Sequence, residues 1–335
     1  MAPDALSPDD PRVEHHFSDV GGGIKYHYIV ANPKEKPTAT VLLLHGWPDL
    51  GMGWRFQVPY LLSLGLQVIV PDQLGYGQTS APDSPERYSL KEMSDNMAHI
   101  IREVTNEPVI LGGHDWGAFL AWRLAMYHQP LIRAIFCFCI PFNPPQLTLT
   151  PLEEFVEQNP KFRYQLHNAS PEAETAINES PAHLRGFLNS MFGGATPEGL
   201  PGFDPWVGIF TDRLPRIQPS PLVTPEIMDY YFREYSRNGL HGPMNWYRTR
   251  PIIWKEELPL AQQEASFKFQ IPAMLVMGGQ DHVLTPDLAD GQERYFEAGL
   301  KKEIIQDASH WVMIHCPDES NKLIGEFVTS VLSKD

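Results

Sequence analysis

Five short apolar runs recur along the chain and constrain its fold more than any other feature. Each run is nearly continuous rather than alternating, which is typical of parallel strands covered on both faces. The runs are "ATVLLLHG" (39–46), "LQVIVPD" (66–72), "PVILGG" (108–113), "IRAIFCFCI" (132–140) and "IPAMLVMGG" (271–279). Segments with helical apolar spacing, such as "WGAFLAWRLAMYHQ", separate them. This order predicts an α/β fold with a mostly parallel, doubly wound sheet, and "GGIKYHYIVAN" predicts an antiparallel strand at one edge.

One long interval interrupts the alternation of strands and helices. From 142 to 267 the chain has no strand-like apolar run, but it has many aromatic residues, many prolines and helical stretches such as "PEIMDYYFREYSRN". We therefore expect an inserted, mainly helical cap. The predicted division is a core from 1 to 141, a cap from 142 to 267 and the second part of the core from 268 to 335.

The charge and composition exclude several classes of partner. A formal net charge of −15 argues against nucleic acid or an anionic membrane surface. No apolar run approaches the ~20 residues needed to span a bilayer, and the N-terminus lacks the pattern of a secretory signal, so we expect no membrane insertion and a cytoplasmic location. Three cysteines, without zinc-ligand spacing, predict neither disulfides nor a metal or cofactor site. The oligomeric state stays open, with a homodimer as one alternative.

The segment "LGGHDWGA" has the shape of a nucleophile turn with aspartate at its centre. Asp115 follows the run that ends in Gly113 and precedes a predicted helix, the strand-turn-helix setting in which such a motif is credible. The helix N-terminus also favours negative charge. The alternative is an aspartate that only caps the helix. Together with the motifs that follow, the setting favours a nucleophile.

Two further motifs place an acid and a histidine downstream of Asp115. Asp281 follows the strand-like run 271–279, and His310 lies in "SHWV" after a short strand-like stretch. Nucleophile, acid and histidine in this chain order are what an α/β-hydrolase architecture requires. Asp287 and Asp307 are the runner-up acids, and a histidine without a catalytic role is the alternative for His310.

The segment "LLLHGWPD" supplies candidate hydrogen-bond donors for an oxyanion. It follows a strand, at the sheet edge where ligands bind in open α/β folds. The N–H of Trp47 is predicted to pair with the N–H of Trp116 as an oxyanion hole. The alternative is a tight turn with a core-facing His45, and both interpretations are compatible because His45 is predicted to be structural.

Together these motifs resemble the α/β-hydrolase fold epoxide hydrolases, the soluble epoxide hydrolase family. The resemblance rests on HGWPD, "PDQLGYGQTSAP", GGHDWG, GGQDHVLTP and SHW, and it runs from about residue 15 to 330. It implies the α/β-hydrolase fold with a helical cap. One departure is Leu74, where many relatives carry arginine, and this departure raises the question of how Asp72 is held.

An aspartate nucleophile selects for particular substrates. A carboxylate can displace at saturated carbon and form an alkyl ester. Water activated by His310, which Asp281 orients, can then hydrolyse that ester while the two amides stabilise the oxyanion. The predicted substrates are therefore small hydrophobic epoxides or alkyl halides, and the predicted reaction converts an epoxide and water to a vicinal diol.

The resemblance also implies two cap tyrosines that hydrogen-bond the epoxide oxygen. They match Tyr164 in "FRYQLHN" and Tyr247 in "GPMNWYRTR". A phenol with an ordinary pKa of about 10 is protonated at neutral pH and can donate. Other cap tyrosines have a helical spacing that predicts packing, namely Tyr230, Tyr231 and Tyr235.

Four aromatic residues are predicted to line the substrate pocket, namely Trp47, Trp116, Phe142 and Trp311. Two other functions compete with epoxide hydrolysis. A haloalkane or haloacetate dehalogenase would use the same aspartate and histidine, with Trp116 as a halide donor, but it gives no reason for both tyrosines. A non-catalytic receptor of the same fold would not require an intact nucleophile, acid and base.

Overall fold

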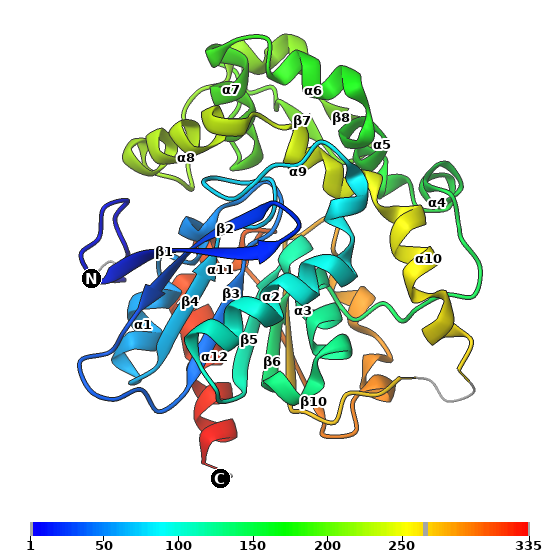
Figure 1. The fold of residues 1–335 in the computed structure, drawn as a ribbon. Coiled ribbons are helices and arrows are strands. Elements are labelled where there is room, and N and C mark those ends of the chain that lie inside the picture. The colour runs from blue at the N-terminus through cyan, green and yellow to red at the C-terminus, as the bar shows by residue number, and fades with distance from the viewer. Residues whose placement is uncertain (1–2, 264–266, 334–335) are drawn as a thin grey trace. The chain divides into compact units, whose positions relative to one another are not determined.

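The computed structural model describes residues 3–263 and 267–333, and its largest feature is an eight-stranded sheet (Figure 1). The strand order is β1-β2-β4-β3-β5-β6-β9-β10. The strands are β1 (Val13–Gly21), β2 (Ile24–Ala31), β3 (Thr40–Leu44), β4 (Gln67–Pro71), β5 (Val109–His114), β6 (Ile132–Phe138), β9 (Ala273–Gly278) and β10 (Leu300–Ile305). Only the β1–β2 and β2–β4 pairs among these strands are antiparallel. The predicted parallel sheet with an antiparallel edge is confirmed.

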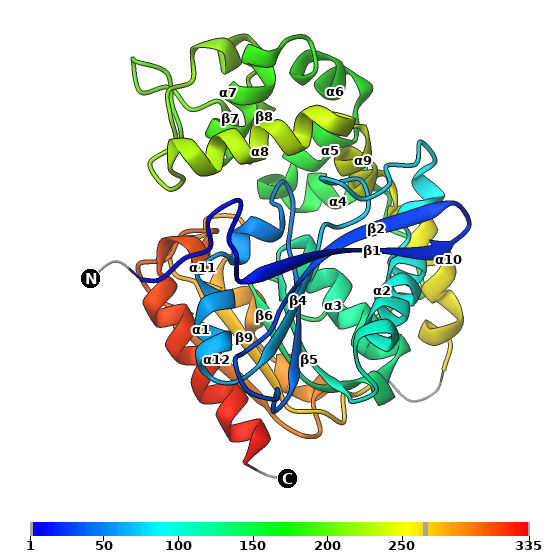
Figure 2. The same ribbon diagram turned by 60° about the vertical axis from the view of Figure 1, so that its left-hand side comes forward.

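Helices cover both faces of this sheet. Figure 2 shows α1 (Gln57–Ser63) and α12 (Pro317–Leu332) on one side, and α2 (Leu90–Val104) and α3 (Trp116–Tyr127) on the other. The short helix α11 (Val312–His315) precedes α12. Every residue of β3, β5 and β9 is buried, which explains why their sequences are continuously apolar. The predicted α/β-hydrolase fold is confirmed.

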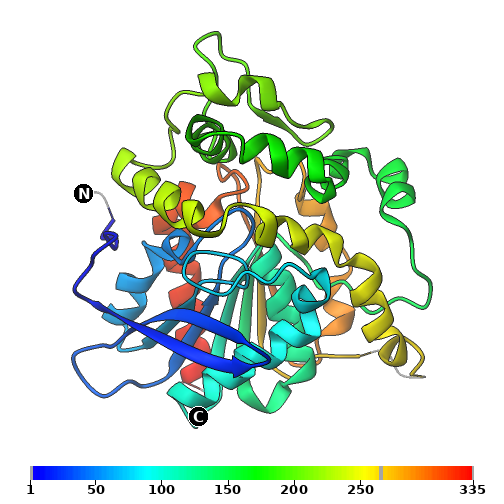
Figure 3. The same ribbon diagram turned by 45° about the horizontal axis from the view of Figure 1, so that its top comes forward.

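The chain divides into two compact units. Unit 1, the core unit, comprises Met1–Gln73, Leu90–Pro145 and Pro259–Asp335, and unit 2 comprises Leu74–Ser89 and Gln146–Leu258. Figure 3 shows the helices that give unit 2 its mainly helical character, in green and yellow. They are α4 (Leu152–Gln158), α5 (Tyr164–Ala169), α6 (Pro171–Ile177), α7 (Pro181–Met191), α8 (Pro225–Asn238), α9 (His241–Asn245) and the start of α10 (Arg250–Ala261), with the small strands β7 (Phe203–Asp204) and β8 (Gly208–Ile209).

Short 3-10 helices link these elements. They are η1 (Gly51–Trp54), η2 (Pro85–Tyr88), η3 (Gln129–Leu131), η4 (Pro160–Phe162), η5 (Thr211–Arg216), η6 (Trp246–Arg248), η7 (Pro286–Ala289) and η8 (Gln292–Tyr295). Within the two described ranges, no helix is both long enough and apolar enough to cross a membrane. The cytoplasmic location and the oligomeric state stay predictions.

The segment Leu74–Ser89 belongs to unit 2, although the sequence pattern places it among core elements. The indole N–H of Trp246 donates to the carbonyl of Leu74 at 2.9 Å. Gly75 approaches Gly242 so closely that a Cβ on Gly75 would lie 2.8 Å from the Gly242 backbone. These contacts link positions far apart in the sequence, so local patterning does not reveal them. The predicted boundaries at 142 and 267 stay a prediction.

Candidate active site

Asp115 lies at the turn between β5 and α3 in a strained backbone conformation. Its φ is 52° and its ψ is −124°. A non-glycine residue held in such a region costs on the order of 1–3 kcal/mol, and sharp strand-to-helix turns of this kind expose the nucleophile in α/β-hydrolase folds. The side chain makes no capping hydrogen bond to α3. Helix capping therefore does not explain the carboxylate.

Two glycines allow backbone segments to approach Asp115 closely. A Cβ on Gly117 would lie 2.2 Å from the carbonyl oxygen of Leu44, at the end of β3. A Cβ on Gly46 would lie 2.6 Å from the Cβ of Asp115. Both separations are far below normal contact distance, so any side chain at either position would displace α3 or the loop after β3.

Backbone amides hold the Asp115 carboxylate. The N–H of Trp47 donates to Oδ1 at 2.9 Å, and the N–H of Trp116, the first residue of α3, lowers the pKa of the same carboxyl. Burial is the largest influence on the pKa of Asp115 and raises it above 3.8, although the charge of His310 and the two amides act in the opposite direction. The two predicted donors therefore meet at one carboxylate.

His45 helps to hold the loop that carries Trp47. Its Nδ1 donates to the carbonyl of Gly46 at 2.9 Å, and its Nε2 accepts from the N–H of Gln73 at 3.0 Å. Burial lowers the pKa of His45 to about 4, so the ring is neutral at pH 7. A neutral, fully hydrogen-bonded ring agrees with the predicted structural role.

His310 and Asp281 form a hydrogen-bonded pair at the ends of neighbouring strands. Nδ1 of His310 donates to Oδ2 of Asp281 at 2.8 Å, while the N–H groups of Val283 and Leu284 donate to Oδ1 at 2.9 Å each. Burial raises the pKa of Asp281, but the charge and hydrogen bond of His310, with the two amides, lower it overall to about 2. Burial lowers the pKa of His310, but Asp281 raises it well above 6.5.

The structure brings the three predicted triad residues together. Nε2 of His310 lies 3.9 Å from Oδ2 of Asp115, a separation longer than a direct hydrogen bond. The runner-up acids, Asp287 and Asp307, are exposed, and the hydrogen-bond partner of His310 is Asp281. The geometry therefore favours Asp281 as the residue that orients His310.

Two residues anchor the backbone of His310, and sequence reasoning assigned them no such role. Nε2 of His114 donates to the His310 carbonyl at 2.9 Å, and the thiol of Cys139 donates to the same oxygen at 3.4 Å. Burial, followed by the charge of His310, lowers the pKa of His114 to about 3, so it stays neutral. The only sequence signal for His114 was its position before Asp115, and Cys139 had no signal beyond an apolar strand.

Within the described ranges, His114, Cys139 and His310 lie close enough to hold a metal ion, with ligand atoms within 4.8 Å of one another. Burial raises the pKa of the Cys139 thiol to about 11, so it is not the thiolate that metals prefer. Nε2 of His114 is already engaged with the His310 carbonyl. We therefore assign the cluster to holding His310.

Three of the four predicted pocket aromatics belong to segments around the triad, and one does not. The ring of Trp311 lies 5.1 Å from that of His310, and Trp47 and Trp116 supply the amides described above. Phe142 is instead fully buried in an aromatic cluster with Trp122, Phe269 and Tyr295. The predicted place of Phe142 in the pocket lining stays a prediction.

Asp72 is held without the arginine that many relatives carry at position 74. Nδ1 of His27, on β2, donates to Oδ2 of Asp72 at 2.7 Å, and both side chains are buried. The ring of His15, on β1, hydrogen-bonds Nε2 of His27 at 2.8 Å. A histidine from the antiparallel edge of the sheet therefore binds the Asp72 carboxylate.

Unit 2 brings Tyr164 and Tyr247 together. Tyr164 is the first residue of α5, Tyr247 lies in η6, and their ring centroids are 6.0 Å apart at an interplanar angle of 80°. Two of the other cap tyrosines pack in the interior as predicted, because Tyr231 contacts Phe192 and Tyr235 contacts Tyr76, whereas Tyr230 is partly exposed beside Tyr231. Residues separated by more than eighty positions therefore form one tyrosine pair.

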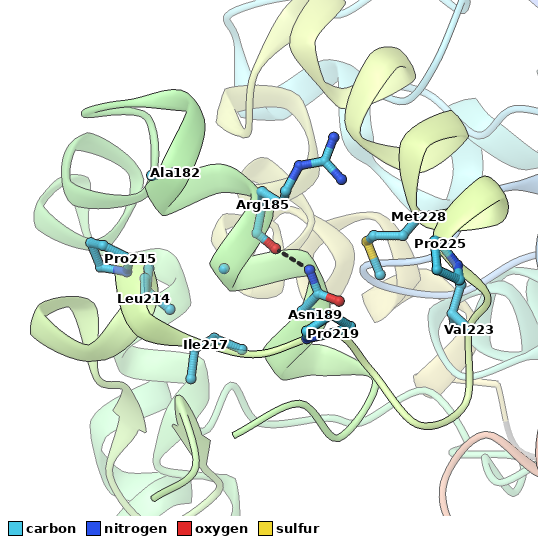
Figure 4. Close-up of a pocket in the computed structure, with 11 residues that line it drawn as sticks. Ala182, Arg185, Asn189, Leu214, Pro215, Ile217, Pro219, Val223, Pro225 and Met228 are labelled. Atoms are coloured by element: carbon cyan, nitrogen blue, oxygen red, sulfur yellow. Dashed lines mark hydrogen bonds between the residues drawn. The ribbon is translucent and has the colours of Figure 1, made fainter. Parts of the chain in front are cut away.

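Unit 2 also contains a cavity of about 240 Å³ that does not include the tyrosine pair. Figure 4 shows it between α7 and α8. Its lining includes Arg185, Asn189, Leu214 and Met228. The amide of Asn189 donates to the backbone carbonyl of Arg185 at 2.9 Å, so this polar side chain is already satisfied within the protein.

Comparisons with known proteins define the family. A family model described as the alpha/beta hydrolase fold matches residues 39–315. Epoxide hydrolase srdG of Neurospora crassa is 57% identical over 342 residues, covering 99% of this chain and 100% of that protein. Bifunctional epoxide hydrolase 2 of Rattus norvegicus is 29% identical over 325 residues, covering 96% of this chain but only 56% of that protein.

A solved structure agrees with these relatives. The crystal structure of an epoxide hydrolase from Vigna radiata is 25% identical and has a TM-score of 0.81, covering 95% of this chain and 98% of that one. The chain therefore belongs to the α/β-hydrolase fold family and, within it, to the epoxide hydrolases. The predicted family and enzyme class are confirmed.

Proposed function

We propose that this protein converts a small hydrophobic epoxide and water to a vicinal diol through an alkyl ester on Asp115. One observation carries the proposal. The Asp115 carboxylate sits on a strained turn, accepts the N–H of Trp47 at 2.9 Å and faces Nε2 of His310 at 3.9 Å. A carboxylate that is held by amides and flanked by a histidine is arranged for attack and then for ester hydrolysis.

In the first step, the carboxylate opens the epoxide ring. Oδ1 accepts the N–H of Trp47, so the proposed nucleophile is Oδ2, which forms a bond to one ring carbon. The bond between that carbon and the epoxide oxygen breaks, and its electron pair goes to the oxygen. The hydroxyls of Tyr164 and Tyr247 are proposed to hydrogen-bond this oxygen, and one of them supplies its proton.

In the second step, water hydrolyses the ester. Asp115 loses its negative charge on alkylation, and this change removes one influence that keeps His310 protonated. Neutral His310 can then take a proton from water, whose oxygen attacks the carbonyl carbon of Asp115. The Trp47 and Trp116 amides stabilise the oxyanion, and Asp281 stabilises the imidazolium. Breakdown of the oxyanion breaks the bond to the substrate oxygen, which takes the proton held by His310 and leaves as the diol. The carboxylic acid left on Asp115 gives its proton back to the tyrosinate through solvent, so the carboxylate, the phenol and neutral His310 are all regenerated.

The two competing functions are less well supported. The named relatives are epoxide hydrolases, and the paired tyrosines suit an oxygen leaving group, whereas a halide needs no proton donor. Membership of an enzyme family and the presence of nucleophile, acid and base argue against a non-catalytic receptor.

Heavy-oxygen water tests the covalent route. Under single turnover in labelled water, the first diol should carry unlabelled oxygen from Asp115, while the label enters the enzyme carboxylate. A second turnover of the isolated enzyme in ordinary water should then transfer the label to the diol. Label in the first diol would instead indicate direct attack by water and overturn the ester mechanism.

A further inference from the structure

Arg248 connects the two segments that carry the tyrosine pair. It follows Tyr247 in η6, and its Nε donates to the carbonyl of Ala169 at 3.0 Å. Ala169 is the last residue of α5, the six-residue helix that begins at Tyr164. One guanidinium therefore ties the end of the Tyr164 helix to the residue next to Tyr247.

Two further partners fix the orientation of this guanidinium. Nη2 of Arg248 donates to Oε2 of Glu174, on α6, at 3.0 Å, and Nη1 donates to Oδ1 of Asn245 at 2.9 Å. Glu174 also accepts from Nδ1 of His241, on α9, at 2.9 Å. Of the helices that meet at this network, α5 lies beside α6 and also beside α9 (Figures 1 and 2).

The burial of the pair distinguishes it from an ordinary surface ion pair. The side chains of Arg248 and Glu174 are only 17% and 20% exposed. Exposed ion pairs contribute little to stability, but charge-assisted bonds from a planar guanidinium to several fixed acceptors hold those acceptors in a specific geometry. Lysine offers a single ammonium on a flexible chain, so it cannot reproduce three diverging bonds.

We infer that Arg248, oriented by Glu174, is a positioning residue that sets the separation of the Tyr164 and Tyr247 hydroxyls for one epoxide oxygen. This inference rests on the proposed function of the two tyrosines. The rings contact edge-on at 6.0 Å, and movement of α5 relative to η6 would change where both hydroxyls point. A displacement of about 1 Å in a catalytic arrangement can cost roughly 10²-fold in rate.

The β7–β8 hairpin also holds α5. The N–H of Tyr164 donates to the carbonyl of Pro205 at 3.0 Å, and Nδ1 of His167 accepts from the N–H of Ile209 at 2.9 Å. The Tyr164 ring also contacts Phe203 edge-on. Because the hairpin holds α5 independently, losing Arg248 should shift the helix relative to η6 without unfolding it.

The test measures the two chemical steps separately in Arg248→Gln and Arg248→Lys, by rapid quench with an aryl epoxide. Ring opening should slow by about 10- to 100-fold in Arg248→Gln, with little recovery in Arg248→Lys. Hydrolysis of the ester, which depends on His310, should stay near the wild-type rate. The matched control is Arg185→Gln, which breaks the Arg185–Asp229 ion pair between α7 and α8 and should alter neither step.

A double-variant comparison separates positioning from a general loss of structure. With Tyr164→Phe already present, adding Arg248→Gln should cost much less than it does in the wild type, because one of the positioned hydroxyls is gone. Equal slowing of both steps, an undiminished effect in the Tyr164→Phe background, or wild-type ring opening in Arg248→Gln would each overturn the inference.

Two further outcomes keep the test decisive. If Arg248→Gln does not fold, Glu174→Gln weakens the same orientation with a side chain of equal size, and it should slow ring opening alone. Wild-type ring opening in folded Glu174→Gln would then overturn the inference.

If Tyr164→Phe itself opens epoxides at the wild-type rate, the proposed function of the tyrosines fails, and the positioning inference fails with it. A slow Tyr164→Phe beside a normal Arg248→Gln rejects only the positioning role.

Discussion

The core unit and unit 2 hold their candidate catalytic groups by different means. In the core unit, Asp115, Asp281 and His310 follow the strands β5, β9 and β10, and main-chain amides bind both carboxylates. In unit 2, Tyr164 and Tyr247 lie on a six-residue helix and a three-residue 3-10 helix, which the side chain of Arg248 connects.

This difference indicates which substitutions should displace each set of catalytic groups. Parallel strands with register set by a full ladder of hydrogen bonds place the triad. Apart from Gly46 and Gly117, where a side chain would displace the turn, single substitutions outside the triad should therefore move it little. Short helices depend on individual side-chain contacts, so the tyrosine pair should respond to substitutions beyond the tyrosines themselves. Substitutions in the core unit should therefore change the rates of both ring opening and ester hydrolysis. Substitutions in unit 2 should change the rate of ring opening alone.

The largest expected effect is in the core unit. Asp115→Ala removes the nucleophile and should abolish diol formation, while the protein stays folded because a buried charge and its desolvation cost are removed together. Diol formation and melting temperature measure the two effects. Asp115→Gly is the matched control, since it is equally inactive but tolerates the positive φ, and it should melt no lower than Asp115→Ala. Turnover by either variant would contradict the nucleophile assignment.

Loss of the base, His310, should stop the reaction at the alkyl ester that forms after ring opening. His310→Gln keeps the carboxylate able to open the ring but removes the group that activates water, so intact-mass measurement should show protein plus one substrate mass. Asp281→Asn should slow hydrolysis similarly but less completely, because orientation of His310 and stabilisation of the imidazolium are lost. If neither variant accumulates an adduct with several reactive epoxides, His310 does not have this role.

Removing the tyrosine hydroxyls should affect ring opening and spare hydrolysis. Tyr164→Phe or Tyr247→Phe alone removes one donor and should slow ring opening by roughly 10²-fold, on the scale of one donor in a preorganised site. The double variant should nearly eliminate alkylation of Asp115 by epoxides. Pre-steady-state alkylation is the measurement, and an alkyl halide is the control substrate because it needs no proton. Near wild-type ring opening in the double variant would assign the leaving oxygen to other donors.

The smallest expected effect is the fall of the ring-opening rate at acid pH. Burial raises the pKa of the Asp115 carboxyl above 3.8, so its protonated, unreactive form persists to higher pH than for an exposed aspartate. The ring-opening rate should therefore fall as pH drops through a midpoint above 3.8. Ionisation of a donating phenol should lower the rate only on the alkaline side. An acid midpoint below the ordinary aspartate value would contradict the burial argument.

The sequence by itself determined the sheet, the chain order of the triad and the family. Continuous apolar runs indicate strands that are covered on both faces. The carboxyl ends of parallel strands lie at the same edge of the sheet. Asp115, Asp281 and His310 each follow such a run or a short strand-like stretch, so local patterns were enough to predict that they meet. The tyrosine pair could be predicted only from the resemblance of "FRYQLHN" and "GPMNWYRTR" to the family.

Only the tertiary structure decided how these groups are held. His114 and the carbonyl of His310 are 196 positions apart, and Arg248 and the carbonyl of Ala169 are 79 apart. The same is true of the aromatic cluster that Phe142 forms with Phe269 and Tyr295, and of His27, which binds Asp72 across 45 positions. Each contact depends on which elements pack together, and short-range periodicity contains no information about a partner that the fold brings in from elsewhere in the chain.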